Sequence, residues 1–139
     1  MSEPIWLTAE IVIAIHEAQL IEHGGPSGIR DAGLLDSAVD RARNKWAYEN
    51  ADLPELAAAY GFGIARNHPF IDGNKRTSLM VIFTFLGVND IDFIVPEADF
   101  AAIILSLAAG EVSEPSLARW ISDNWPAGAP LMIGDVPSA

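Results

Sequence analysis

The run Leu79–Leu86 constrains the fold more than any other feature of this sequence. Every residue in it except Thr84 is apolar, and apolar and polar residues do not alternate as they would in a half-buried strand. The run belongs to a longer stretch that begins at Asn74, and this length favours a helix. A helix that is apolar on all sides has to be covered on all sides. We therefore expect a central buried helix with further elements packed around it.

Residues that cap helix N-termini divide the rest of the chain. These residues are Thr8, Asp31, Asp52 and Ser113. Their side chains can accept a hydrogen bond from the first free amides of a helix. One helix should end near His68, because Pro69 disfavours helical geometry at the residue before it. Together with the central helix, the pattern predicts an all-α fold of about six helices, the other five over about 9–23, 32–48, 53–67, 97–109 and 114–125.

The chain of 139 residues has the length of a single domain with a core of its own. We place that domain at residues 1–125. Residues 126–139 contain three prolines and two glycines, and we expect them to form a flexible C-terminal tail.

The composition excludes several classes of function. The absence of cysteine excludes disulfides and thiolate metal sites. The net charge of −11 argues against general binding of nucleic acid, because phosphate contacts need clustered Lys and Arg side chains. The apolar runs are far too short to span a bilayer, and the first residues lack the features of a signal peptide. We therefore expect a cytoplasmic protein that binds neither membrane nor nucleic acid.

The segment His68–Arg76, with the sequence His-Pro-Phe-Ile-Asp-Gly-Asn-Lys-Arg, holds the residues best suited to chemistry. Gly73, Asn74 and Lys75 fall at the expected start of the central helix, where the first backbone amides lack partners and the helix dipole favours an anion. Gly73 has no Cβ to keep a phosphate away from the backbone. Lys75 and Arg76 add side-chain cations. The segment is therefore a candidate phosphate site.

Two further residues of the segment suit the transfer of a phosphate-containing group. Asp72 is a lone carboxylate beside these cations, and proteins commonly hold Mg²⁺ through one or two carboxylates, phosphate oxygens and water. His68 is a candidate general base that could take a proton from an attacking hydroxyl. We expect Phe70 to anchor the segment in the core.

Residue types alone leave a structural interpretation open. A His-Pro pair followed by Asp-Gly is a common connection between helices, and the cations Arg66, Lys75 and Arg76 could be solvated charges at helix ends. A Walker-type phosphate loop is excluded, because the glycine spacing before Gly73 is wrong. Zinc is disfavoured, because too few further ligands lie near the histidine and the aspartate. We assign no catalytic role to His16, which we expect to be partly buried or solvated on the first helix.

The nine-residue segment resembles the signature of the Fic/Doc superfamily, and specifically of its death-on-curing (Doc) toxin branch. Fic enzymes that transfer AMP have a second glycine at the position of Lys75, whereas Doc proteins have lysine there. The segment Gly28–Ala38 is also similar to the one that follows the substrate-facing flap in Doc-like proteins. The resemblance extends over about residues 5–125, and it implies a compact helical bundle with a catalytic loop before the central helix.

The resemblance also implies roles for single residues. His68 would be the general base and Asp72 the ligand of Mg²⁺, with Arg76 as the third catalytic residue. The phosphates of ATP would be bound by Gly73, Asn74, Lys75 and Arg76.

Lys75 decides which chemistry the resemblance implies. Its side chain would crowd the place where Fic enzymes hold the α-phosphate, and Doc proteins are understood to bind ATP in the reverse sense, with the γ-phosphoryl toward the acceptor hydroxyl. The implied protein is a toxin that phosphorylates a protein hydroxyl, with translation elongation factor Tu as the expected kind of target. The alternatives are AMP transfer of the Fic type and a catalytically inactive Fic-fold binding protein.

Fic-fold proteins are often restrained by a helix with the pattern Ser/Thr-x-x-x-Glu-Gly/Asn, whose glutamate pairs with the arginine of the signature. Glu49 is the only glutamate in this sequence that Gly or Asn follows, and Lys45 stands four residues before it. We therefore expect restraint by a separate antitoxin, bound in a groove near the active site and the amino-terminal helices.

Overall fold

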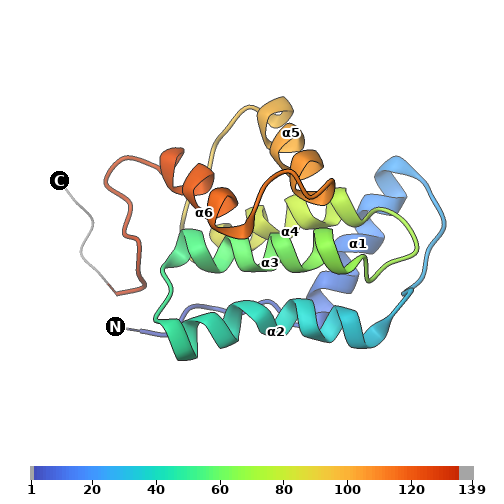
Figure 1. Ribbon diagram of the computed structural model, residues 1–139, viewed down its shortest axis with the longest axis horizontal. Coiled ribbons are helices and arrows are strands. Elements are labelled where there is room, and N and C mark those ends of the chain that lie inside the picture. Colours follow the sequence, from blue (N-terminus) through green and yellow to red (C-terminus); the bar gives the residue numbers. More distant parts are fainter. Residues whose placement is uncertain (1, 135–139) are drawn as a thin grey trace.

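The computed structural model describes residues 2–134, which form six helices (Figure 1). They are α1 (Ala9–His23), α2 (Ala32–Glu49), α3 (Leu53–Asn67), α4 (Asn74–Val88), α5 (Glu97–Ala108) and α6 (Glu114–Asp123). The described residues contain no strand, only an isolated bridge between Ile29 and Phe70. The all-α fold of six helices is thereby confirmed. None of the helices in this part of the chain is both long and apolar enough to cross a membrane.

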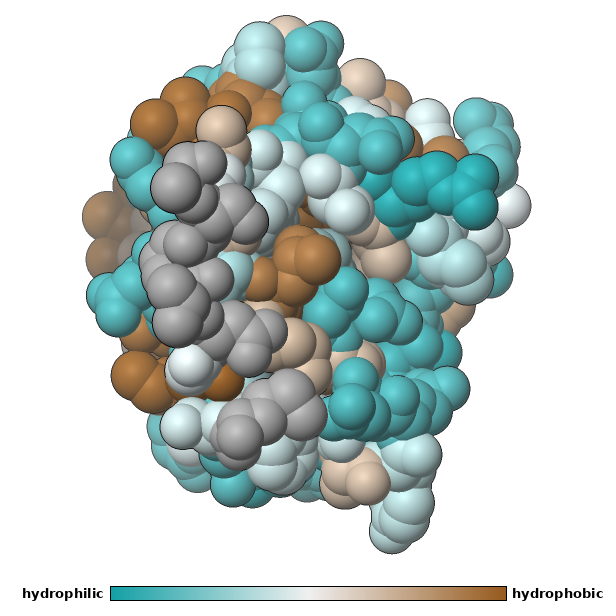
Figure 2. Space-filling view, turned by 90° about the vertical axis from the view of Figure 1, so that its left-hand side faces the viewer, coloured by the Kyte–Doolittle hydropathy of each residue, from teal (hydrophilic) through white to brown (hydrophobic). Residues whose placement is uncertain are grey.

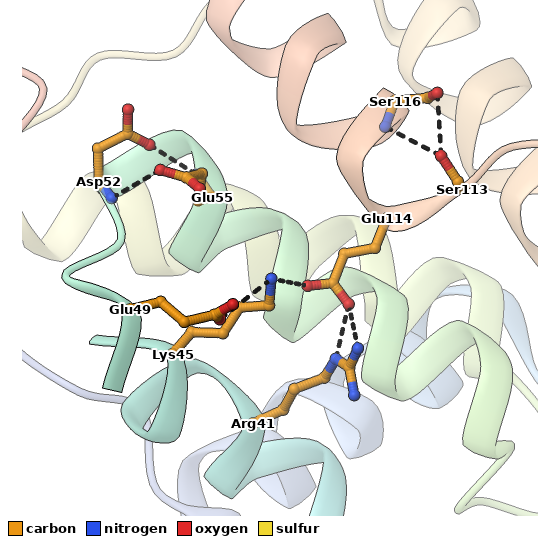
Figure 3. A network of polar contacts seen from close by, with 8 residues as sticks. All are labelled: Arg41, Lys45, Glu49, Asp52, Glu55, Ser113, Glu114 and Ser116. Atoms are coloured by element: carbon orange, nitrogen blue, oxygen red, sulfur yellow. Dashed lines mark hydrogen bonds and ion pairs between the residues drawn. The ribbon is translucent and has the colours of Figure 1, made fainter. Parts of the chain in front are cut away.

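The expected capping residues begin four of the helices. Thr8, Asp31, Asp52 and Ser113 each accept a hydrogen bond from the backbone amide three residues further on. Figure 3 shows the cap of α3, in which the side chain of Glu55 also accepts a hydrogen bond from the backbone of Asp52 at 3.1 Å. The start of α4 differs, because its N-cap is a glycine and no side chain caps its first amides.

The centre of the bundle is α3, not α4 as the apolar run suggested. α3 packs against α2, α4, α5 and α6, and 11 of its 15 residues are buried (Figure 1). α4 packs against α1, α3 and α5, and Phe83 remains 47 % exposed. The physical reason is side-chain size: α3 is rich in alanine and glycine, so more helices can approach it than can approach the bulky surface of α4.

Two glycines of α3 permit this close approach. A Cβ built on Gly63 would lie 2.9 Å from Cα of Ala38 in α2, and one on Gly61 would lie 2.8 Å from Cγ1 of Ile82 in α4. Neither position has room for a side chain without movement of its neighbours. The hydroxyl of Ser78 also donates a hydrogen bond to the carbonyl of Gly61 at 2.7 Å, which ties α4 to α3.

A buried glutamate joins α6 to α2 (Figure 3). Glu114 is 6 % exposed; its Oε1 accepts from Nε of Arg41 at 2.7 Å, and its Oε2 lies 2.9 Å from Nζ of Lys45. Burial alone would lower the pKa of Lys45, but the hydrogen bond and charge of Glu114 outweigh this effect and raise the pKa. Removal of Glu114 would leave two cations without this partner.

Residues 126–134 lie at the end of the bundle opposite the α3–α4 loop, beside the N-terminal segment (Figure 1). The amide of Leu53 donates to the carbonyl of Leu131 at 2.7 Å, and the amide of Ser2 donates to that of Ile133 at 3.2 Å. Figure 2 looks at this end and shows small apolar patches separated by polar side chains. The expected tail continues through 135–139, outside the described residues, and its flexibility stays a prediction.

Candidate active site

The α3–α4 loop, residues 68–73, changes direction at both of its ends. At the end of α3, His68 takes the left-handed conformation (φ 52°, ψ 54°), since the following proline disfavours a continued right-handed helix. At the start of α4, Gly73 has φ 78°, a conformation that glycine adopts without strain. The two turns place the loop directly in front of the N-terminus of α4.

The segment between α1 and α2 pairs with the backbone of this loop. The amide of Arg30 donates to the carbonyl of Pro69 at 2.7 Å, and the amide of Ile71 donates to that of Gly28 at 3.1 Å. Every residue from 24 to 31 is exposed. This segment, which we call the flap (residues 24–31), therefore covers the loop from the solvent side.

The guanidinium of Arg30 closes the end of α3. Its Nε donates to the carbonyl of His68 at 2.6 Å and its Nη2 donates to that of Asn67 at 2.8 Å. These carbonyls lie at a helix end, where intrahelical partners are lacking. Arg30 thereby fixes the backbone that carries the candidate base. The sequence contained no signal for this role, because the contact joins residues that are 37 and 38 positions apart.

Asn74 organises the loop from inside. The side chain is 3 % exposed; its Oδ1 accepts from the amide of Phe70 at 3.0 Å, and its Nδ2 donates to the carbonyl of Phe70 at 2.9 Å. Nδ2 also lies 3.1 Å from Nδ1 of His68. Because an amide nitrogen can only donate, Nδ1 of His68 accepts, and the neutral ring carries its proton on Nε2. Both hydrogens of the Asn74 amide are thus used within the loop.

His16 of α1 packs against the buried side of the loop. Its ring is 2 % exposed and lies parallel to the ring of Phe70, with 3.8 Å between centroids and an interplanar angle of 4°. Its Nε2 lies 2.7 Å from the carbonyl oxygen of Asp72. Phe70, which is fully buried, therefore anchors the loop as expected. His16 is more deeply buried than expected and contacts the loop directly.

A pocket of about 310 Å³ opens at this place, and it brings the sequence-predicted residues together. Its lining is made of His68, Asp72, Gly73, Asn74, Lys75 and Arg76. These are all the residues that the sequence suggested for catalysis or nucleotide binding. Their individual roles stay predictions.

The electrostatics of the pocket favour an anion. The uncapped N-terminus of α4 presents free amides and the positive end of the helix dipole. Lys75 and Arg76 are exposed on the first turn, and within the described part of the chain neither forms an ion pair. Arg66, the third cation considered from the sequence, lies elsewhere: its guanidinium is over the ring of Phe62, 5.6 Å from the centroid. Two of the three cations therefore serve this pocket.

Asp72 carries the one carboxylate among the residues that line the pocket. No group of three or more His, Cys, Asp or Glu side chains that could hold a metal ion is found among the described residues. Mg²⁺ does not require one, because it is usually held through one or two carboxylates with phosphate oxygens and water. An exposed carboxylate beside an anion pocket fits that mode of binding.

Gly25 of the flap adjoins this carboxylate. A Cβ built on Gly25 would lie 2.7 Å from Oδ2 of Asp72, and Gly25 has φ 117°. Both the space and the backbone conformation therefore favour glycine here. Gly25, like His16 and Arg30, is a site residue that the sequence did not reveal, since its contact with Asp72 joins distant parts of the chain.

Comparison with known proteins agrees with this geometry. A family model described as the Fic/DOC family matches residues 6–86, more than half of the chain. A protein of Escherichia phage P1 named Protein kinase doc is 34 % identical over 113 residues, which are 81 % of this chain and 89 % of that protein. Toxin Doc of Mycolicibacterium smegmatis is 42 % identical over 86 residues, which are 57 % of this chain and 65 % of that protein.

The family match includes the flap and all the residues that line the pocket. The resemblance drawn from the segment His68–Arg76 is confirmed by these matches. The chain belongs to the Fic/DOC family.

Proposed function

We propose that this protein is a toxin that transfers the γ-phosphoryl group of ATP to a hydroxyl of a target protein. The observation that carries the proposal is the position of Lys75, which lines the same pocket as His68 and Asp72. Lysine at this position is typical of the Doc branch, and glycine of the Fic enzymes that transfer AMP. The name of the relative from phage P1, a protein kinase, supports the same chemistry.

In this proposal the acceptor oxygen forms a bond to the γ-phosphorus, and the bond from that phosphorus to the β–γ bridging oxygen breaks. ADP leaves with the bridging oxygen. The amides at the start of α4, together with Lys75 and Arg76, hold the phosphates and stabilise the negative charge. Mg²⁺, bound by Asp72 and phosphate oxygens, would neutralise part of the charge on ATP.

The proton of the acceptor hydroxyl passes to His68 in this scheme. At rest, Nδ1 of His68 accepts from Asn74, so the neutral ring has its proton on Nε2. The ring can therefore accept a proton at Nε2 only after a change of tautomer that places the hydrogen on Nδ1. We propose that binding of ATP and target brings about this change by altering the contact with Asn74.

Control and target are also proposals. Glu49, the one glutamate with a sequence partly like the inhibitory pattern, ends α2 and lies 3.6 Å from Nζ of Lys45, so it is occupied by an ion pair outside the pocket. This supports restraint by a separate antitoxin, as does the name of the mycobacterial relative, a toxin. We propose elongation factor Tu as the target and the cytoplasm as the place of action.

The position of the transferred label tests the proposed chemistry. The protein is incubated with Mg²⁺, purified elongation factor Tu and ATP labelled at either the γ- or the α-phosphate. We expect label on the target only from the γ position. Transfer of the α label would instead establish nucleotide transfer and overturn the kinase proposal. No transfer to this target or to any protein of a cell extract would favour a binding protein without turnover.

Toxicity in cells provides a second test. We expect His68→Ala to abolish toxicity and to leave antitoxin binding unchanged, because the substitution removes the proposed base from an exposed position. His23→Ala is a matched control, since His23 lies at the end of α1 and not in the pocket. Equal toxicity of the His68 variant and the wild type would exclude the general-base role.

A further inference from the structure

His16 is a polar residue at a buried position of α1, where packing alone would favour an apolar side chain. It lies on the buried side of α1 together with Val12, and it is 2 % exposed. A buried imidazole without a hydrogen-bond partner would be costly. Its Nε2 has a partner, the carbonyl oxygen of Asp72 at 2.7 Å. The Nε2 atom of the buried ring therefore finds its partner in the active-site loop.

The contact defines the hydrogen on the ring. A carbonyl oxygen can only accept, so Nε2 of His16 must carry a hydrogen and donate it to Asp72. The ring is also held in orientation, because it lies parallel to the ring of Phe70 at 3.8 Å. A Cβ built on Gly73 would lie 3.5 Å from Nε2 of His16, so the ring also adjoins the backbone at the start of α4. His16 thus contacts the loop at two points, the ring of Phe70 and the carbonyl of Asp72.

The direction of the Asp72 carbonyl has a consequence for the next amide. The peptide bond between Asp72 and Gly73 is trans, as are all the peptide bonds described. In a trans peptide the carbonyl and the N–H point in opposite directions. A carbonyl that points inward to His16 therefore turns the N–H of Gly73 outward. Gly73 lines the pocket, and within the described residues its N–H has no hydrogen-bond acceptor.

We propose that His16 is a positioning residue of the active site. By donating to the Asp72 carbonyl, it fixes the peptide plane so that the Gly73 amide faces the anion pocket in line with the free amides of α4. The same contact fixes the backbone from which the Asp72 carboxylate extends. This inference rests on the proposed function, since the anion is taken to be the phosphate chain of ATP.

Two substitutions separate the hydrogen bond from the packing. His16→Leu fills the space but cannot donate, whereas His16→Gln retains an N–H donor of similar reach. His23→Leu is the control for loss of a histidine on the same helix. Binding of the non-hydrolysable analogue adenylyl imidodiphosphate with Mg²⁺ is measured by calorimetry, and folding by circular dichroism. We expect His16→Leu to weaken binding about tenfold, as for loss of one well-placed hydrogen bond, with His16→Gln close to the wild type.

Nuclear magnetic resonance of the free protein gives a readout that does not depend on nucleotide. The ¹⁵N shifts of His16 should show the hydrogen on Nε2, and the amide resonance of Gly73 should move in His16→Leu and return in His16→Gln. A hydrogen on Nδ1 alone, or an unchanged Gly73 resonance in His16→Leu, would overturn the inference. These wild-type and Gln measurements decide the question even if the Leu variant does not fold.

The outcomes also separate this inference from the proposed function. If the wild type transfers γ label but His16→Leu binds the analogue as tightly, only the positioning role is wrong. If the wild type neither binds the analogue nor transfers label, the proposed function is wrong, and the resonances of His16 and Gly73 still decide whether His16 orients the peptide.

Discussion

Asn74 donates a hydrogen bond from its side-chain Nδ2 to Nδ1 of His68 across 3.1 Å. The amide cannot be reversed, because its oxygen accepts from the backbone amide of Phe70 at 3.0 Å. The first residue of α4 therefore selects the tautomer of His68, the residue that follows the last residue of α3. Asn74, which the sequence suggested for nucleotide binding, therefore also determines which nitrogen of the candidate base carries the hydrogen.

The first prediction concerns that tautomer. In the resting protein, ¹⁵N shifts of the neutral form of the His68 ring should show its hydrogen on Nε2. If His68 acts as a base through Nε2, addition of the ATP analogue and target should move the hydrogen to Nδ1. A ring that already carries its hydrogen on Nδ1 at rest would show that Asn74 does not select the tautomer.

The second prediction compares two buried asparagines at the two ends of α4, Asn74 as its first residue and Asn89 as its C-cap. Asn74→Ala should remove two hydrogen bonds to Phe70, destabilise the protein by about 1–3 kcal/mol and strongly reduce transfer. Asn89, at the opposite end of α4, makes a similar set of bonds with the backbones of Ile5 and Phe85. Asn89→Ala should therefore be similarly destabilising but leave the transfer rate of the folded protein unchanged. Urea denaturation and γ-label transfer measure the two effects.

If both asparagine variants lost transfer in proportion to stability, the effect of Asn74 would be general destabilisation and not the positioning of His68. The comparison is informative because both side chains are almost fully buried, at 3 % and 6 % exposure.

The third prediction concerns the contact of the flap with Asp72. In Gly25→Ala the new Cβ would meet Oδ2 of Asp72 at 2.7 Å, so the flap or the carboxylate has to move. We expect transfer to fall at least tenfold and to require more Mg²⁺, with at most about 1–2 kcal/mol lost in stability. Gly24→Ala is the control: Gly24 also has a positive φ, of 79°, but a Cβ there would meet nothing within 4 Å.

A Gly25→Ala variant with the Mg²⁺ dependence and rate of Gly24→Ala would mean that the backbone conformation alone matters. The proposed link between the flap and the carboxylate of Asp72, the proposed ligand of Mg²⁺, would then be wrong.

The helices of this fold could be predicted from the sequence because their signals are local. Asp52 followed by Leu-Pro, and His68 followed by proline, mark the two ends of α3 through hydrogen bonds and steric clashes between near neighbours. The centre of the bundle could not be predicted in the same way. It depends on how closely Gly63 of α3 approaches Ala38 of α2, a contact between distant parts of the chain.

The same division applies to the site. The pocket residues from His68 to Arg76 are consecutive or nearly so, and the start of a helix was enough to gather them. His16, Gly25 and Arg30 come from α1 and the flap. His16 and Arg30 act through backbone carbonyls, whereas Gly25 adjoins the carboxylate of Asp72. Every residue has a backbone carbonyl, so a contact to such a group does not depend on the residue type of the partner and cannot be predicted from it. Such supporting residues become visible only when the chain is folded.

The fourth prediction concerns the dependence of stability on pH. Burial and the nearby charge of Glu55 raise the pKa of Asp52 from 3.8 to about 6. Between these two values the folded chain binds more protons than the unfolded chain, so stability increases as the pH falls through this window and decreases as it rises. Asp52→Asn retains the capping oxygen without the charge. Because Asp52 is partly solvated, we expect Asp52→Asn to gain only on the order of 1 kcal/mol at pH 7.5.

Below about pH 4 the advantage of Asp52→Asn should vanish, since both forms are then neutral. Asp31→Asn, at the exposed N-cap of α2, controls for the general replacement of a capping carboxylate. Chemical denaturation at a series of pH values measures the difference. An advantage that is equal at pH 4 and pH 7.5 would contradict a raised pKa at Asp52.

The fifth prediction concerns the attachment of the N-terminal segment to α3. The hydroxyl of Tyr60 accepts from the amide of Leu7 at 3.0 Å and donates to its carbonyl at 3.2 Å. Burial raises the pKa of Tyr60 to about 12, so the hydroxyl remains able to donate at any ordinary pH. Tyr60→Phe would leave both backbone groups of Leu7 without this partner, at a cost of about 1–3 kcal/mol.

Leu7 immediately precedes Thr8, the N-cap of α1. The loss of the two hydrogen bonds should therefore destabilise the start of that helix first. Amide hydrogen exchange should become faster at Leu7 and in the first turn of α1, while γ-label transfer should change little, because Tyr60 does not line the pocket. Tyr48→Phe, at an 86 % exposed position, should have no measurable effect on either quantity. Equal stability of the Tyr60 and Tyr48 variants would show that the two hydrogen bonds to Leu7 do not hold the N-terminal segment, since both substitutions remove the same single oxygen.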